Sequence, residues 1–133
     1  MTRVEVSAGS GISYISAGFP SPAEDFTELS ISLDKHLIQN PAATFMAYAN
    51  GNSMVRAGIY HGDILIIDRS LDARDGDIII AVLDGEFTVK QLSIINGTLF
   101  LIPQNPQYSS LEISDEMDFE VWGVVTYSIR KHR

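Results

Sequence analysis

The chain has 133 residues, contains no cysteine and carries a formal net charge of −8, so the sequence excludes disulfide bonds and thiolate metal sites. A protein that grips a phosphate backbone needs clustered Lys and Arg. Here these residues are scattered, except in the short tail 130–133. We therefore predict no direct DNA binding. The length favours one domain, and a hydrophobic content of 45% is sufficient for its core.

The sequence shows no membrane-targeting segment and no set of residues with the spacing of a metal site. No apolar run approaches the length of a membrane span, and residues 1–6 lack the apolar centre of a signal peptide. The aspartates between residues 63 and 77 lack calcium-loop spacing, and turn chemistry accounts for most of them. We predict a cytoplasmic protein without cofactor or metal.

Residues 1–30 show no sustained hydrophobic period, and we interpret them as an arm that precedes a β-rich domain over residues 31–133. The stretch from Phe19 to Pro22 is expected to be extended, because each proline restricts the residue before it. The preceding run, which begins at Tyr14, has two interpretations. It is either a strand that lies in a cleft or a mobile linker with incidental apolar residues.

The domain begins with a predicted short helix over residues 33–38, with Ser32 as its N-cap. Short strands bounded by turn signals follow: Thr44–Ala49, Ile64–Ile67, Ile78–Leu83, Glu86–Leu92, Thr98–Ile102 and Phe119–Tyr127. The dipeptides Asp84-Gly85 and Asn96-Gly97 are typical of two-residue hairpins. We predict a mainly β fold, a small sandwich or partly open barrel. The third strand is apolar without alternation, which indicates burial on both faces or a position at a dimer seam.

A serine in a glycine-led turn, Gly51-Asn52-Ser53-Met54, comes just after the first of these strands. The backbone of such a turn holds the serine so that its side chain points outward. This placement suits a nucleophile. Its hydroxyl still needs a neighbouring base to take the proton. The alternative is a structural role, in which Ser53 starts a helical turn that continues to Arg56.

The best candidate for the base is Lys90, on the strand that follows the Asp84-Gly85 hairpin. The three histidines at positions 36, 61 and 132 lie in a polar helix, a loop and the tail, and are poorer candidates. A lysine beside Thr88 on a half-buried strand is partly desolvated, which lowers its pKa and favours the neutral amine. The alternative is a solvated lysine on a half-exposed strand.

Three motifs in order resemble the LexA-type self-cleaving serine peptidases. They are Ala17-Gly18 followed by Phe-Pro-Ser-Pro, Ser53 in Gly-Asn-Ser-Met, and Lys90 in Gly-Glu-Phe-Thr-Val-Lys. Their separations, 53 − 17 = 36 and 90 − 53 = 37 residues, agree with that family. Within it the chain is most similar to the UmuD-like accessory subunits of the error-prone DNA polymerase V. One departure is Asn52, where the family often has Asp.

The resemblance implies a mechanism and a set of partners. Ser53 would attack the carbonyl of Ala17, Lys90 would act as base, and the backbone N–H groups of Asn52 and Ser53 would be the oxyanion donors. A RecA–single-stranded DNA filament would accelerate this cleavage. The trimmed homodimer, starting at Gly18, would join a Y-family, UmuC-like polymerase subunit in SOS mutagenesis.

Three alternatives come from other classes of protein. A LexA-type or phage-repressor-type C-terminal domain is disfavoured, because a DNA-binding domain would precede the bond and only residues 1–17 do so here. A signal-peptidase-like enzyme would use the same dyad on foreign substrates and would need a membrane anchor. A non-enzymatic β-rich interaction module would use Ser53 and Lys90 structurally and would stay whole at high pH.

Overall fold

The computed structural model describes residues 3–8, 11–16 and 32–133, in two compact units, 1–39 and 40–133. The first unit contains an antiparallel hairpin, β1 (Arg3–Ala8) and β2 (Gly11–Ser16), and the short helix α1 (Leu33–Leu37). Ser32 stands at the N-cap of α1 as predicted, but its side chain makes no capping hydrogen bond. The interpretation of residues 1–30 as an arm did not specify this hairpin. Its β-branched residues favour strands in runs too short to show a sustained period.

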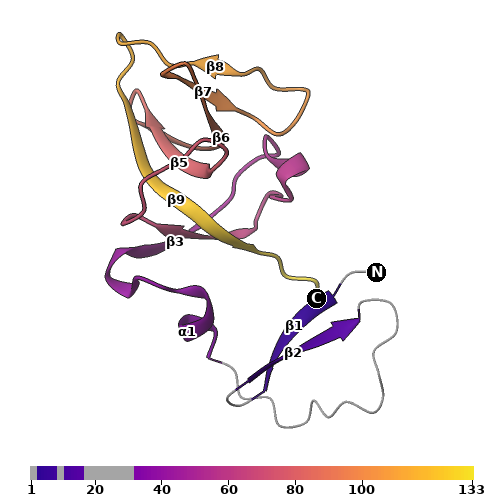
Figure 1. Cartoon of the computed structure of the whole chain (residues 1–133). Helices are drawn as coiled ribbons and strands as arrows, with labels where there is room; N and C mark the ends of the chain where they lie inside the picture. The colour runs from indigo at the N-terminus through magenta and orange to yellow at the C-terminus, as the bar shows by residue number, and fades with distance from the viewer. Residues whose placement is uncertain (1–2, 9–10, 17–31) are drawn as a thin grey trace. The chain divides into compact units, whose positions relative to one another are not determined.

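The second unit is a seven-stranded antiparallel sheet with the order β3-β4-β9-β5-β6-β7-β8 (Figure 1). Its strands are β3 (Thr44–Tyr48), β4 (Ile64–Asp68), β5 (Ile78–Leu83), β6 (Glu86–Ile95), β7 (Thr98–Ile102), β8 (Leu111–Glu112) and β9 (Phe119–Ile129). Two 3₁₀ turns, η1 (Pro41–Ala43) and η2 (Val55–Ala57), flank β3 and the loop after it. The predicted mainly β fold with one short helix is confirmed.

Strand positions were predicted better than strand lengths. The bounds of β5 and β7 match the prediction, whereas β6 and β9 run further than predicted and the two-residue β8 was missed. Both hairpin turns are confirmed by the left-handed backbone of their first residues, Asp84 and Asn96, each with φ of 50°. Two successive positive φ values define the type I′ turn, which matches the twist of the flanking strands.

Strand β5 is buried on both faces, as its unbroken apolar run predicted. Ile79 and Ala81 are fully buried in one apolar cluster with Leu92, Leu101 and Val124. Ile80, on the opposite face, belongs to a second cluster with Ala49, Met54, Ile59, Leu65 and Ile67. The second cluster lies directly beneath the loop that carries Ser53, so the core positions that loop.

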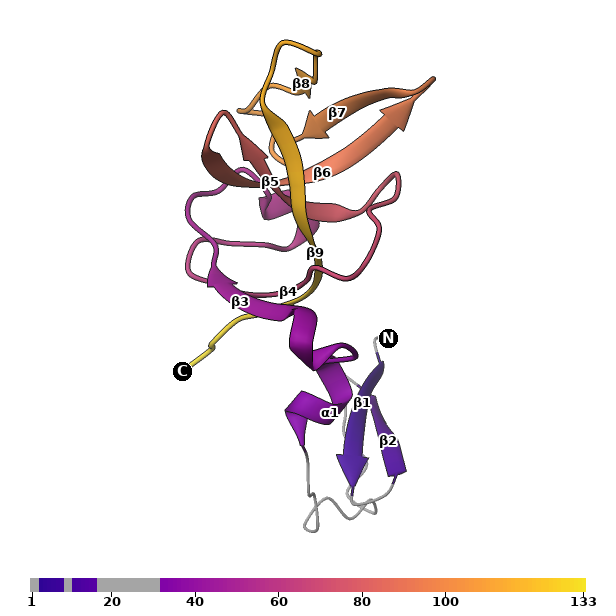
Figure 2. The ribbon, with the colours of Figure 1, turned by 90° about the vertical axis from the view of Figure 1, so that its left-hand side faces the viewer.

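Strand β9 bends because it carries two bulges, one against β4 and one against β5. Figures 1 and 2 show it as a long curved strand that reaches both of these neighbours. In the second bulge Ile80 pairs with Gly123 and Ala81 with Val121, so that Trp122 has no partner on β5. The extra residue turns the Trp122 side chain toward the second apolar cluster, where it packs.

Gly123 is predicted to be sensitive to the smallest enlargement. A Cβ at this position would meet Cγ2 of the buried Ile67 at 2.5 Å. We expect Gly123→Ala to lower the free energy of unfolding by about 1–3 kcal/mol, the usual effect of overpacking a core. Urea unfolding would measure the change, with the exposed Ser128→Ala on the same strand as control. Equal midpoints for the two variants would contradict the predicted clash.

Candidate active site

The serine turn is held between two buried residues of the core. Ala49, directly after β3, is 6% exposed, and Met54, directly after Ser53, is 3% exposed. Between them Gly51 adopts a φ of 90°, in the left-handed region that glycine occupies without strain. The chain then enters η2. Ser53 is therefore presented at a sharp turn whose two ends cannot shift without disturbing the core.

Two side chains from other loops bind the backbone of this turn. The Gly51 N–H donates a hydrogen bond to Nδ1 of His61 at 3.0 Å. The Asn105 side chain donates from Nδ2 to the Asn52 carbonyl at 2.7 Å. No role is predicted for Asn105 from the sequence, and His61 is predicted only as a poor candidate for the base. No local motif indicates either contact, because Asn105 lies 53 residues from Asn52.

Lys90 on β6 contacts Ser53 directly. The distance from Lys90 Nζ to Ser53 Oγ is 3.1 Å. Nζ also donates to Oγ1 of Thr88 at 2.7 Å and to the Val89 carbonyl at 3.0 Å. A neutral amine has two N–H groups and one lone pair. Its two donors are satisfied by Thr88 and Val89, so the lone pair is left to accept the hydroxyl proton of Ser53.

Burial lowers the pKa of the Lys90 ammonium below its ordinary value. None of its three hydrogen-bond partners is charged, so no carboxylate there favours the ammonium form. Desolvation therefore acts unopposed by an ion pair at this nitrogen. This is the electrostatic condition for a lysine that works as a general base.

A groove of about 370 Å³ opens over the two residues. Most of its lining is apolar and comes from β3, the serine turn, β5, β6 and Trp122 of β9. Its rim carries exposed apolar side chains, with Tyr48 75% and Phe87 64% exposed. Strand β3 stands at the end of the sheet order, so within the described residues one of its edges has no strand partner. An extended peptide can pair with such an edge.

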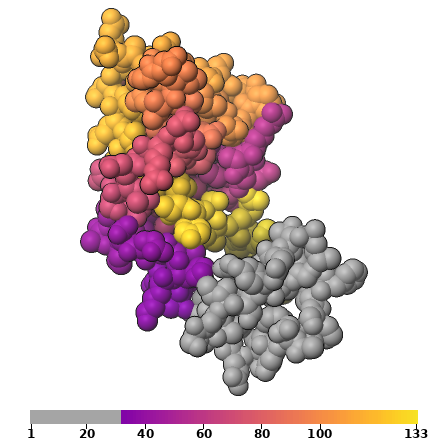
Figure 3. All heavy atoms as spheres, viewed as in Figure 1, coloured from indigo at the N-terminus to yellow at the C-terminus, as the bar shows by residue number. Residues whose placement is uncertain are grey.

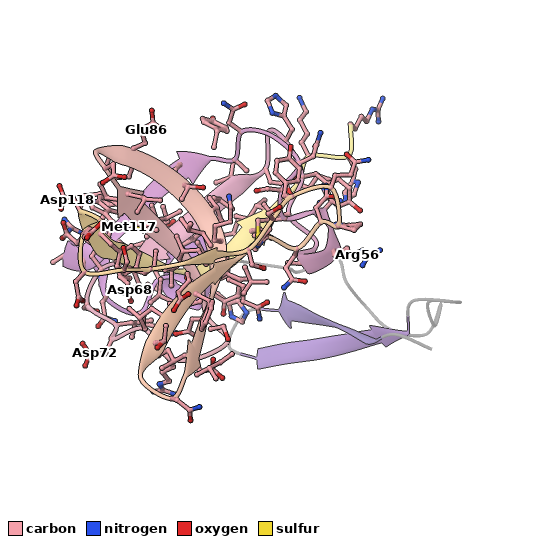
Figure 4. All side chains as sticks on the ribbon, turned by 90° about the horizontal axis from the view of Figure 1, so that it is seen from above. Arg56, Asp68, Asp72, Glu86, Met117 and Asp118 are labelled. Atoms are coloured by element: carbon pink, nitrogen blue, oxygen red, sulfur yellow. The ribbon has the colours of Figure 1, made fainter. Side chains whose placement is uncertain are left out.

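Three of the acidic side chains of the domain are placed clearly. Asp72, Glu86 and Asp118 are exposed and point away from the sheet (Figure 4). In the basic tail, whose yellow spheres lie on the visible face of Figure 3, Arg130 pairs with the buried Asp63 at 2.9 Å. The hydrogen bond from Arg130 is the main reason that the pKa of the Asp63 carboxyl lies below its ordinary value. One arginine of the tail is thus used within the protein.

The structure brings together Ser53 and Lys90, which the sequence singled out 37 residues apart. It places His36 on α1 and the exposed His132 in the tail, whereas His61 binds the turn but not Ser53. Ala17 and Gly18 lie outside the described residues. Among residues 3–8, 11–16 and 32–133, no helix has the length and apolarity of a membrane span, and no acidic or histidine cluster has the geometry of a metal site.

Comparisons with known proteins show the family of the chain. The model of the Peptidase S24-like family matches residues 10–126. The chain is 44% identical to Protein SamA of Salmonella typhimurium over 88% of its own length and 81% of SamA. It is 40% identical to Protein MucA of Escherichia coli, over 89% of this chain and 81% of MucA. It is 33% identical to the LexA repressor of Stenotrophomonas maltophilia, over 90% of this chain and 56% of that repressor. The chain therefore belongs to the Peptidase S24-like family of serine peptidases, as its resemblance to the LexA-type and UmuD-like proteins predicted.

Proposed function

We propose that this protein is a self-cleaving serine peptidase, which removes its own N-terminal arm by cutting the bond between Ala17 and Gly18. The observation that carries the proposal is the 3.1 Å contact between Ser53 Oγ and Lys90 Nζ. This amine is desolvated, and none of its hydrogen-bond partners carries a charge. The two residues lie in a groove with an apolar lining beside an open strand edge. Membership of a serine peptidase family supports the same reading.

In the proposed reaction Ser53 Oγ attacks the carbonyl carbon of Ala17, and its proton passes to the lone pair of Lys90 Nζ. The backbone N–H groups of Asn52 and Ser53 stabilise the oxyanion. The Ala17–Gly18 bond then breaks, and the Lys90 ammonium returns the proton to the leaving amine of Gly18. Water attacks the resulting Ser53 ester, with Lys90 again as base. The products are a carboxylate at Ala17 and a free hydroxyl on Ser53.

The substrate segment would bind as an extended strand against the free edge of β3. Residues 19–22 contain two prolines, which favour an extended chain just after the scissile bond. The small side chains of Ala17 and Gly18 suit a bond that must approach Ser53 closely. In this proposal residues 1–30 are the cleaved and docking arm, and residues 31–133 are the peptidase domain.

The biological setting follows from the family resemblance. We infer that a RecA–single-stranded DNA filament stimulates the cleavage, and that the trimmed product forms a homodimer. This dimer would bind a UmuC-like Y-family polymerase subunit in translesion synthesis after DNA damage. The relatives SamA, MucA and the LexA repressor support a place in this group. The net charge of −8 favours action through protein partners over direct contact with DNA.

The proposal predicts one new pair of fragments. Purified protein held at alkaline pH should split into residues 1–17 and 18–133, because Lys90 is then neutral and the proposed site needs no other component. Intact-mass spectrometry would identify the bond. A RecA filament added near neutral pH should accelerate the same cut. Cleavage at a different single bond would contradict the assignment of Ala17–Gly18, and a chain that stays whole would favour an interaction module.

A further inference from the structure

Asn105 uses both ends of its side-chain amide. Its Nδ2 donates to the Asn52 carbonyl at 2.7 Å, and its Oδ1 accepts from the Gln107 N–H at 3.0 Å. The two bonds agree with each other, because each requires the same orientation of the amide. One end closes the local turn after β7, and the other end reaches across to the serine turn.

The segment that carries Asn105 is itself held firmly. Pro103 is buried, and the Gln104 carbonyl accepts the Arg56 N–H at 2.8 Å. The Gln104 side chain also donates to the Gln91 side chain, next to Lys90 on β6. Residues 103–105 are therefore tied both to η2, just after Ser53, and to the strand of the base. Asn105 is a fixed point against which the serine turn is set.

The bond to the Asn52 carbonyl also sets the direction of the next N–H. The peptide group between Asn52 and Ser53 is planar and trans, so its C=O and N–H point in opposite directions. The carbonyl points to Asn105, which does not line the groove, whereas Ser53 does. The Ser53 N–H consequently points away from Asn105, and Ser53 itself lines the groove. Among the described residues no acceptor within the protein takes this N–H.

On the other side of the turn, His61 fixes the peptide group between Asn50 and Gly51 through the Gly51 N–H. Two side chains thus restrain the peptide groups that flank the residue pair Gly51-Asn52. A preorganised donor is worth more than a mobile one, because it needs no reorientation when charge develops. Asn105 is the restraint nearer to Ser53.

We propose that Asn105 is a positioning residue of the peptidase, which holds the Asn52–Ser53 peptide group so that the Ser53 N–H is aimed at the oxyanion. The inference rests on the proposed function, since it assigns Asn105 to the same reaction. Asn105 does not touch the substrate. It acts only through the Asn52 carbonyl. Without Asn105 the Ser53 N–H is still present, but its orientation is no longer fixed.

Asn105→Asp is the sharpest variant. A carboxylate keeps an oxygen for the Gln107 N–H, but it has no hydrogen for the Asn52 carbonyl. Asn105→Ala loses both bonds, and Gln107→Glu adds the same charge at an exposed position nearby while keeping Asn105. The cleavage rate at alkaline pH should fall about 10- to 100-fold in both Asn105 variants, somewhat less than for complete loss of an oxyanion donor. Gln107→Glu should match the unmodified chain.

The pH at which the rate reaches half of its plateau should not move in Asn105→Ala, because this variant adds no charge and leaves the contacts of Lys90 unchanged. A rate within about twofold of the unmodified chain would overturn the proposal. A lower cleavage rate in Asn105→Ala but not in Asn105→Asp would also overturn the proposal. The effect would then come from the lost hydrogen bond with the Gln107 N–H. A shift of the midpoint in Asn105→Ala would overturn the proposal too, because it would mean that Asn105 acts through Lys90.

Labelling of Ser53 by a fluorophosphonate separates this inference from the proposed function. The reagent reacts with Ser53 Oγ, loses fluoride and develops negative charge on its phosphoryl oxygen, with no need for the arm. Asn105→Asp should slow labelling by the same factor as cleavage, with Ser53→Ala as the blank. Unchanged labelling with slower cleavage would overturn the inference. A third outcome separates the two proposals. If the unmodified chain is labelled fast but never cleaves itself, self-cleavage is refuted. Slower labelling of Asn105→Asp would then still support the positioning role.

Discussion

Replacing Ser53 by alanine should abolish self-cleavage and leave the fold intact. The hydroxyl is the only group of this side chain that the reaction uses, and Ser53 is only partly buried, so its loss leaves no large cavity. The rate should fall by about four orders of magnitude or more, as for other serine peptidases that lose the nucleophile. Intact-mass spectrometry over days at alkaline pH would measure the residual rate. Retained cleavage would exclude Ser53 as the nucleophile.

Lys90→Met is the matching change at the base, because it keeps an unbranched apolar side chain of similar length and removes the amine. General-base catalysis contributes about 10²- to 10⁴-fold, and the rate should fall by at least this factor. Lys90→Met should remain folded, which circular dichroism and urea unfolding would check. Cleavage by Lys90→Met at the unmodified rate would assign the proton transfer to another group.

The same substitution should change how stability depends on pH. Burial lowers the pKa of Lys90 in the folded chain, whereas the unfolded chain has the ordinary lysine value of about 10.4. Between these two values the unfolded chain binds more protons, so the free energy of unfolding rises with pH. Below the folded-state pKa the burial cost of the ammonium is present in full. This alkaline gain should disappear in Lys90→Met.

The rate of self-cleavage should rise with pH and then level off. Only the neutral amine of Lys90 accepts the serine proton, so the rate follows the neutral fraction of this side chain. Below the pKa the rate should rise close to tenfold per pH unit. Because burial lowers the pKa of Lys90, the plateau should begin below the ordinary lysine value of about 10.4. Single-turnover rates from about pH 6 to pH 10 would define the curve.

Lys90→Arg tests the assignment of this curve. A guanidinium stays charged throughout the range, so the alkaline rise should be lost.

A RecA filament that acts by stabilising the docked arm would cover Lys90 and favour its neutral form. It should then raise the rate most near neutral pH and little on the plateau. If the unmodified chain cleaved itself at the same rate throughout this pH range, a lysine base would be excluded.

Local chemistry in the sequence was sufficient for most strands of the sheet and for the two candidate reacting residues. Hairpin turns at Asp84 and Asn96 follow from residues that tolerate a left-handed backbone, a property of single positions. The apolar run of β5 predicted burial on both faces because it has no polar alternation. Ser53 and Lys90 were found because each stands in a recognisable motif, and the family model covers both.

Only the tertiary structure decided how these two residues meet. Ser53 follows β3 and Lys90 lies on β6, and the strand order places β4, β9 and β5 between them. The bulges of β9 bend the sheet so that β3 and β6 line one groove, and the bulged Trp122 joins that lining. Pairing register and bulges depend on contacts between distant strands, which no short motif encodes.

The supporting contacts of the site depend on the tertiary structure in the same way. Thr88 could be anticipated as a neighbour of Lys90, because alternate residues of a strand share a face. The contacts of His61 and Asn105 with the serine turn could not, because loops that are distant in sequence meet there only after the sheet has formed. Sequence by itself singled out Ser53 and Lys90 as the candidate nucleophile and base. The long-range packing of the sheet decided their 3.1 Å approach, the desolvation of the amine and the direction of the Ser53 N–H.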